Sequence, residues 1–235
     1  MTLKEVMTQL EAFGNEGTKK ILRNHGAEEP FFGVKVGDLK KITKKIKKDH
    51  HLSLELYATR NTDAMYLAGL IADEDQITKK DLKKWVKEAY WYYISEFTVP
   101  WVAAETKFGF DLGLEWIKSK KENIAAAGWS TLSSLANLRP DEELDIDKYS
   151  ELLDHIGEHI HEAPNRVRYV MNGFVIAVGG AIKKLSPKAK KIAKKIGKVE
   201  VNVGDTACKV PLATDYIQKV IDRGALGKKR KSARC

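Results

Sequence analysis

Apolar residues recur with the period of an α-helix along almost the whole chain, and this pattern constrains the fold more than any other feature. In the segment 38–46, Leu39, Ile42 and Ile46 lie on one side and lysines fill the remaining surface. The segment 186–197 repeats the pattern between a proline near its start and a glycine at its end. The same spacing predicts further helices at about 2–13, 17–25, 53–59, 62–74, 78–94, 97–109, 111–119, 122–136, 147–161, 164–183 and 213–223.

One segment departs from this pattern. Residues 199–203 alternate apolar and polar side chains, Gly204 and Asp205 form a turn pair, and 206–210 return to an extended pattern before a proline. The pattern predicts a small β-hairpin at about 199–210. Because an isolated hairpin is marginally stable in water, it must pack on something. It either projects toward a ligand of the neighbouring basic helix or covers an edge of the core.

The predicted helices suggest a repeat architecture. The segments 37–41 and 80–84 carry the related sequences GDLKK and KDLKK at a separation close to the period of HEAT-type helix pairs. Glycines inside apolar helical runs are typical of helices that approach closely. We therefore expect an all-α, HEAT-like helical-repeat solenoid with the β-hairpin as an insertion; an irregular helical bundle is the alternative. Residues 1–226 are expected to form a single domain, and residues 227–235 a basic, disordered tail.

Charge is distributed unevenly along the chain. The net charge is +9, yet the segment 183–198 holds eight lysines without a carboxylate, and 141–162 is strongly acidic. Such a field favours a polyanion on one side of the molecule, although any single lysine run can be a solvated helix face. DNA, duplex or branched, is therefore the expected partner. The predicted DNA-binding residues are Lys183, Lys184, Lys188, Lys190, Lys191, Lys194, Lys195, Lys198, Lys209, Arg166 and Arg168.

Several other classes of function are disfavoured. The longest nearly uncharged stretch, 171–182, is too short to cross a membrane, and no secretory signal pattern opens the chain, so we expect a cytoplasmic protein with no membrane partner. Nucleotide-binding glycine loops are absent, and no cofactor is expected. The H-x-x-E-H pattern at 155–159 lacks an evident third ligand, and no metal site is predicted. The sequence does not determine the oligomeric state.

The strongest candidate for chemistry lies in an aromatic segment, 85–101. Tyr92 and Glu96 are four residues apart and share a face if the helix is continuous. Glu96 is the carboxylate with the clearest reason to be functional, because it sits in an aromatic run. Tyr92 would form an aromatic wall beside it.

Two stretches carry a family resemblance: PFFGVKVGDLK at 30–40 and SEFTVP at 95–100. With the helical spacing, they resemble the AlkD-type DNA alkylation repair family of HEAT-like proteins, over roughly residues 1–195. The resemblance implies a solenoid whose concave, basic face holds duplex DNA and, in active members, the excision of cationic alkylated purines. It places the catalytic aspartate at Glu96, an aromatic partner at Tyr92, an arginine near Gly128 and a second tryptophan near Gly173 or Phe174.

A carboxylate beside the sugar stabilises the oxocarbenium ion that forms when an alkylated purine leaves. Glu96 has one methylene more than aspartate, and Gly128 has no side chain, so this chain departs from the active pattern. The hairpin also resembles an addition in the AlkF and AlkG branch. These departures favour a protein that binds branched or distorted DNA without base excision. The alternatives are an alkylpurine DNA glycosylase that uses Glu96 and a helical-repeat scaffold for an acidic protein.

Overall fold

The computed structural model describes residues 1–234, and over this range the chain is all-helical, as predicted. The longest helices, α9 and α11, have 17 residues each. No helix of the described residues is both long and apolar enough to span a membrane. The helices are α1 (Leu3–Ala12), α2 (Glu16–Asn24), α3 (Val36–Ile46), α4 (His50–Ala58), α5 (Thr62–Ile71), α6 (Lys79–Glu88), the π-helix η1 (Ile94–Thr98), α7 (Val99–Glu105), α8 (Gly109–Trp116), α9 (Glu122–Leu138), the 3-10 turn η2 (Asp141–Glu143), α10 (Ile146–His159), α11 (Asn165–Ala181), the 3-10 turn η3 (Lys183–Leu185), α12 (Ser186–Ile196) and α13 (Ala213–Asp222).

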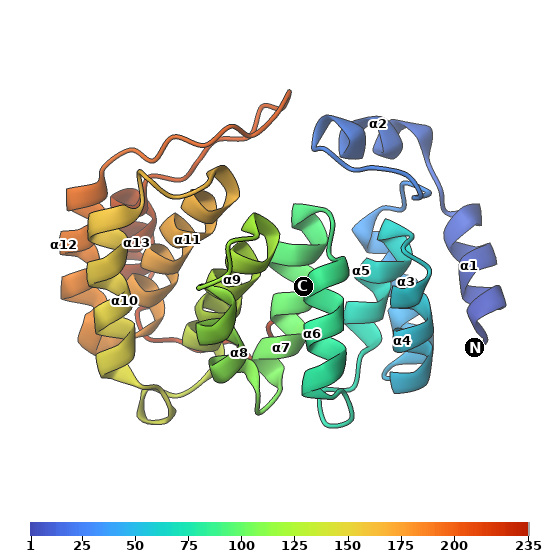
Figure 1. Cartoon of the computed structure of the whole chain (residues 1–235), viewed down its shortest axis with the longest axis horizontal. Coiled ribbons are helices and arrows are strands. Elements are labelled where there is room, and N and C mark those ends of the chain that lie inside the picture. The colour runs from blue at the N-terminus through green and yellow to red at the C-terminus, as the bar shows by residue number, and fades with distance from the viewer. Residues whose placement is uncertain (235) are drawn as a thin grey trace.

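The helices stand side by side in a row that runs from α1 at one end to α12 and α13 at the other (Figure 1). Helices α5, α7, α9 and α11 pack on one another in sequence order and form one layer of the row. A second layer lies against them, in which α4 contacts α5, α6 contacts α7, α8 contacts α9, and α10 and α12 contact α11. We call α5, α7, α9 and α11 the inner helices. Each inner helix thus packs on at least one helix of the second layer, as in a HEAT-like repeat.

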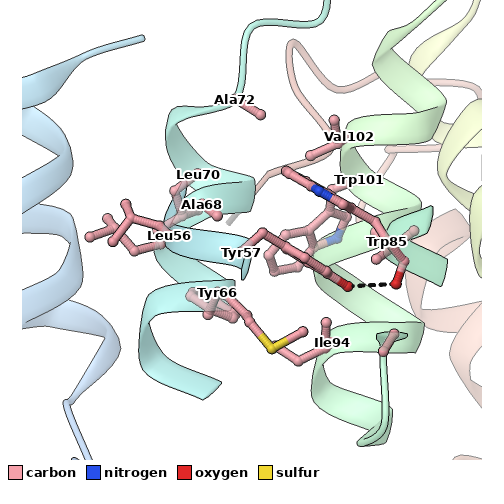
Figure 2. Close-up of a cluster of buried hydrophobic side chains, with 14 of the residues drawn as sticks. Leu56, Tyr57, Tyr66, Ala68, Leu70, Ala72, Trp85, Ile94, Trp101 and Val102 are labelled. Atoms are coloured by element: carbon pink, nitrogen blue, oxygen red, sulfur yellow. Dashed lines mark hydrogen bonds between the residues drawn. The ribbon is translucent and has the colours of Figure 1, made fainter. Parts of the chain in front are cut away.

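Aromatic side chains fill much of the core in the N-terminal half. Tyr57 stacks on Trp85 with ring centroids 4.1 Å apart, and its hydroxyl donates a hydrogen bond to the Trp85 carbonyl oxygen at 2.7 Å (Figure 2). Tyr66 contacts Trp101 edge to face, and both lie in the same cluster. Tyr57 is fully buried, so its hydroxyl needs this partner.

A buried carboxylate holds the segment that connects α2 to α3. Asp63, in the first turn of α5, accepts backbone hydrogen bonds from Phe32, Gly33 and Val34 at 2.6, 3.0 and 3.0 Å. Gly33 has φ +78°, in the left-handed region that favours glycine. The PFFGV stretch behind the family resemblance is therefore a structural turn anchored on α5.

The predicted β-hairpin at 199–210 is wrong, because no strand forms among the described residues. The segment consists of two extended arms joined at Gly204, and they reach from α12 toward α2 (Figure 1). We call it the 199–210 loop. The arms line the two sides of a cavity of about 650 Å³ at the base of the loop and do not pair with each other. Instead, the Asn165 side chain donates to the Asn202 carbonyl oxygen at 2.8 Å and accepts from its amide nitrogen at 2.7 Å. These hydrogen bonds to α11 take the place of the hydrogen bonds between two β-strands that the alternation of apolar and polar residues predicted.

The basic tail also differs from the expected disorder. Its described residues, 227–234, extend along the ends of the inner helices, and Ala233 is buried. The last described residues, Ala233 and Arg234, reach the middle of the row, where they bond to Glu105 at the end of α7 and to the Ala72 carbonyl oxygen just after α5. Cys235, the last residue of the predicted tail, lies outside the described residues.

Candidate nucleic-acid interface

Of the two candidate catalytic residues, Glu96 lies in a local widening of the helical backbone and Tyr92 lies just before it. Residues 94–98 form a π-helical turn, in which the Val99 amide bonds to the Ile94 carbonyl oxygen, five residues back. Pro100 follows at the start of α7 and has no amide hydrogen to donate to Glu96, four residues before it. The missing donor is compatible with the wider turn. The aromatic segment is therefore not one continuous α-helix, since α6 already ends at Glu88.

Glu96 is engaged by an arginine from a distant helix. Arg166, in the first turn of α11, donates to Glu96 Oε1 from Nε at 2.7 Å and to Oε2 from a terminal nitrogen. The side chain of Glu96 is 1 % exposed and that of Arg166 is 18 % exposed. The Arg166 amide also donates to Glu122 Oε1 at 2.6 Å, which fixes the start of α11 against α9. Sequence analysis placed Arg166 among the DNA-binding residues; in the structure its guanidinium group is bound to Glu96.

Two tyrosine rings flank the guanidinium group of Arg166. Its central carbon lies 4.2 Å from the ring centroid of Tyr92 and 4.5 Å from that of Tyr169. The Tyr92 hydroxyl lies 2.9 Å from His25 Nδ1, so α2 and the π-helical turn are connected. Tyr92 and Glu96 do come together, as their spacing predicted, but around an arginine. A cation between two aromatic faces is held by electrostatic attraction to both rings.

Burial and pairing act on the two charged groups in opposite directions. Burial raises the pKa of Glu96 to about 7, and the hydrogen bonds and charge of Arg166 oppose that rise. Burial alone would lower the pKa of Arg166, but the hydrogen bonds and charge of Glu96 raise it above its ordinary value. The guanidinium group therefore stays protonated. The carboxyl group of Glu96 is either protonated or neutralised by Arg166, and in both states it presents no free negative charge.

A cavity of about 500 Å³ opens beside this pair, between α9 and α11. Glu96 and Tyr169 line one part of it, and Ser130, Ser133 and Asn137 line the α9 wall. We call this space the α9–α11 cavity. Its lining includes one carboxylate, Glu96, which Arg166 already neutralises. The two cations that line it, Lys228 and Arg230, come from the tail.

The predicted DNA-binding lysines of 183–195 lie on and just before α12, at the far end of the row (Figure 1). Lys188 Nζ lies 2.6 Å from Asp154 Oδ2 of α10, so its charge is partly used within the fold. Lys190 Nζ donates to Gln218 of α13 at 3.2 Å. Five others are exposed, and none of these five lines the α9–α11 cavity. They are Lys183, Lys184, Lys191, Lys194 and Lys195.

The remaining predicted cations gather at the base of the 199–210 loop. Arg168, Lys198 and Lys209 line its cavity together with Asn165. The Arg168 Nε atom is buried without a hydrogen-bond partner. Lys198 and Lys209 are exposed, and Lys198 lies 3.1 Å from Glu200. These three residues are brought together although 198 and 209 belong to different arms of the loop.

The positions assigned to the family arginine and second tryptophan differ in their surroundings. A Cβ added at Gly128 would lie 2.5 Å from the Ile117 amide nitrogen, so α9 packs directly on the end of α8 there and no larger side chain fits. Gly173 lines the α9–α11 cavity, and a Cβ there would meet nothing within 4 Å. Phe174 is fully buried and stacks on Tyr149. Neither glycine position supplies the side chain that an excising member needs.

Sequence reasoning missed the partner of Glu96 and the place of Tyr169. Both belong to the start of α11, 70 or more positions from Glu96, and no local pattern links them to it. It also missed that Lys228 and Arg230 line a cavity, because a basic run at a chain end is typically solvated.

A sequence model described as DNA alkylation repair enzyme matches residues 6–196, which is most of the chain. The chain belongs to the DNA alkylation repair enzyme family. Two uncharacterized proteins, Lin0241 of Listeria innocua and Lmo0209 of Listeria monocytogenes, are 34 % and 35 % identical to this chain, respectively. Each match spans 229 residues, which is 95 % of this chain and 99 % of the relative.

A solved structure resembles the structure of this chain along the full length of both chains, with 42 % sequence identity and a TM-score of 0.92. That protein is described as part of a new family related to the HEAT-like repeat DNA glycosylases, with affinity for branched DNA structures. The family predicted from the sequence is thereby confirmed, as is the helical HEAT-like architecture at the level of the fold.

Proposed function

We propose that this protein binds branched or distorted DNA through backbone phosphates and does not excise bases. The observation that carries the proposal is the bidentate pair between Glu96 and Arg166. An excising member needs a free carboxylate next to the sugar to stabilise positive charge. Here Glu96, the carboxylate at the position of the family's catalytic aspartate, is buried and already bonded to a guanidinium group.

The resemblance to a protein with affinity for branched DNA supports the binding part of the proposal. We further propose that the chain belongs to the AlkF and AlkG branch, because the similar structure is described as having affinity for branched DNA. Exposed cations at two places favour a polyanion: the outer surface of α12 and the base of the 199–210 loop. Lysines that contact phosphate carry no base information, so little sequence preference is expected. Such a role fits the cytoplasmic location expected from the sequence.

One preparation tests both halves of the proposal. Binding to a four-way junction and to a duplex of the same length is measured as a function of salt, and release of 3- and 7-alkylpurines from alkylated DNA is measured beside it. We expect tighter binding to the junction, an affinity that falls by about 0.9 log unit per phosphate contact for each decade of salt, and no base release.

Two variants that change the net charge by the same amount test whether the position of the lysines matters. Lys191, Lys194 and Lys195 are changed to glutamate in one variant, and Lys40, Lys44 and Lys45 of α3, which are also exposed, in another. The α12 variant should lose junction binding and the α3 variant should retain most of it. Equal losses would show a bulk charge effect. Base release that disappears in Glu96→Gln would instead establish the glycosylase, and a protein without DNA affinity would favour the scaffold for an acidic protein.

A further inference from the structure

The described tail, residues 227–234, crosses the C-terminal ends of the four inner helices one after another. The Gly227 amide donates to the Gly180 carbonyl oxygen of α11 at 2.9 Å, and the Arg230 amide to Asn137 of α9 at 2.7 Å. The Ala233 amide donates to Glu105 Oε1, at the end of α7, at 2.9 Å. Arg234 donates to the Ala72 carbonyl oxygen, just after α5, at 2.6 Å. We call this segment the C-terminal strap.

Two cations of the strap face the helices and hold it there. Lys229 Nζ donates to the Ala136 carbonyl oxygen at 2.8 Å and lies 2.8 Å from Asp141 Oδ1. Arg234 pairs with Glu74 at 2.9 Å and with Glu105 at 2.7 Å. The last carbonyl groups of a helix lack intrahelical donors and carry partial negative charge, so cations and amides there are stabilising. The strap is therefore anchored by the ends of the helices that it crosses.

The neighbouring cations of the strap are oriented differently. Lys228, Arg230 and Lys231 are exposed, and their side chains have no hydrogen bond or ion pair to any described residue. Lys228 and Arg230 line the α9–α11 cavity, together with Tyr169 and Ser134. Lys231 does not line it; Lys231 lines a separate cavity beside Glu74, Glu105 and Glu143. Arg230 lies between the two cavities and lines both, whereas Lys228 lines the α9–α11 cavity alone.

The α9–α11 cavity has the chemistry of an anion site. On α9, the hydroxyls of Ser130 and Ser134 and the second hydrogen of the Asn137 amide offer hydrogen-bond donors, whereas the Ser133 hydroxyl already donates to the Trp129 carbonyl oxygen. Among the described lining residues the one carboxylate, Glu96, is neutralised by Arg166. Lys228 and Arg230, whose side chains have no partner among residues 1–234, therefore face a space in which these residues supply no free negative charge. A DNA phosphate supplies that charge together with several acceptor oxygens.

We propose that the C-terminal strap presents Lys228 and Arg230 to the backbone phosphates of DNA at the α9–α11 cavity. The inference rests on the proposed function and adds a contact outside residues 6–196, the part that the family model matches. Because Lys229 and Arg234 hold the strap in place, the backbone that carries the two contacting side chains needs little further ordering on binding.

Single charge-neutral variants of the full-length chain test the proposal: Lys228→Gln, Arg230→Gln and, as the matched control, Lys231→Gln. Each removes one exposed cation from the same strap. The measurement is the slope of log affinity for a four-way junction against log salt, with a thermal melt of each variant. We expect Lys228→Gln and Arg230→Gln each to reduce the magnitude of the slope by about 0.9, Lys231→Gln to leave it unchanged, and all three to melt as the unchanged protein does.

Three outcomes overturn the proposal, and they are distinguishable. A loss of slope in Lys231→Gln equal to that of the other two would show that the strap acts through its total charge. Unchanged slopes in all three, while the α12 lysine variant still loses binding, would remove the strap and leave the proposed function standing. Failure of the unchanged protein to bind any DNA at low salt would remove both.

Discussion

Glu96 and Arg166 form a bidentate, largely buried ion pair between residues 70 positions apart in the sequence. The pair joins the π-helical turn before α7 to the first turn of α11, and two tyrosine rings enclose the guanidinium group. It occupies the place where the family resemblance expects a free catalytic carboxylate. A residue type that suggests catalysis in the sequence has thus become part of a structural connection between helices.

Removal of the Arg166 side chain should destabilise the folded protein. Arg166→Ala leaves Glu96 buried without its partner, and we expect the free energy of unfolding to fall by about 3–5 kcal/mol, as measured by urea denaturation. The double variant Glu96→Gln with Arg166→Met removes both charges and should recover much of that loss. A double variant less stable than Arg166→Ala would show that the guanidinium group acts through packing on the tyrosines and not through the charge of Glu96.

The pH dependence of stability should carry the signature of Glu96. Burial raises its pKa to about 7, from an ordinary value of 4.5, so between these values the folded state retains a proton that the unfolded state has lost. Stability contributed by this group is therefore complete below about pH 4.5 and is lost as the pH rises through about 7. Glu96→Gln should remove this fall, and denaturation of both proteins between pH 4 and 8 measures the difference in slope. A rise of wild-type stability relative to the variant over that range would mean that attraction to Arg166 outweighs burial.

Two helical glycines should respond oppositely to alanine. Gly128→Ala places a methyl group 2.5 Å from a backbone nitrogen of α8, and the helices must separate, so we expect a loss of about 1–3 kcal/mol. Gly173→Ala meets nothing within 4 Å and should gain about 0.5–1 kcal/mol through helix propensity. Thermal melts of the two variants are the measurement. A stable Gly128→Ala protein would contradict the close approach of α9 to α8.

The 199–210 loop should depend on one side chain for its position. Asn165→Ala removes both hydrogen bonds to Asn202, and we expect faster amide exchange and proteolysis within 200–208 without a large change in melting temperature. Asn165→Asp is the matched variant, since it keeps the acceptor for the Asn202 amide and loses the donor. If the loop contacts DNA, junction binding should weaken in Asn165→Ala more than duplex binding; equal losses would indicate that the loop is only structural.

Much of the secondary structure followed from local patterns. The apolar stripe of α12 and the glycine at its end, with φ +58°, were readable from spacing alone. The apolar pattern begins at residue 38, but α3 begins two residues earlier, at Val36, and Asp38 lies in its first turn. The alternation at 199–210 correctly indicated extended backbone, but alternation does not show whether two arms pair with each other or with a third element.

The sequence by itself determined the helical character, the family and the excess of cations, because periodicity, the motif at 30–40 and composition need no knowledge of distant contacts. Only the tertiary structure decided that Glu96 meets Arg166, that the tail lies across helix ends, and which of its cations remain unpaired. The reason is physical. Hydrogen bonds within a helix join residues a few positions apart, whereas the pairing of a buried charge or of a helix-terminal carbonyl depends on which chain segment the packed helices bring to it.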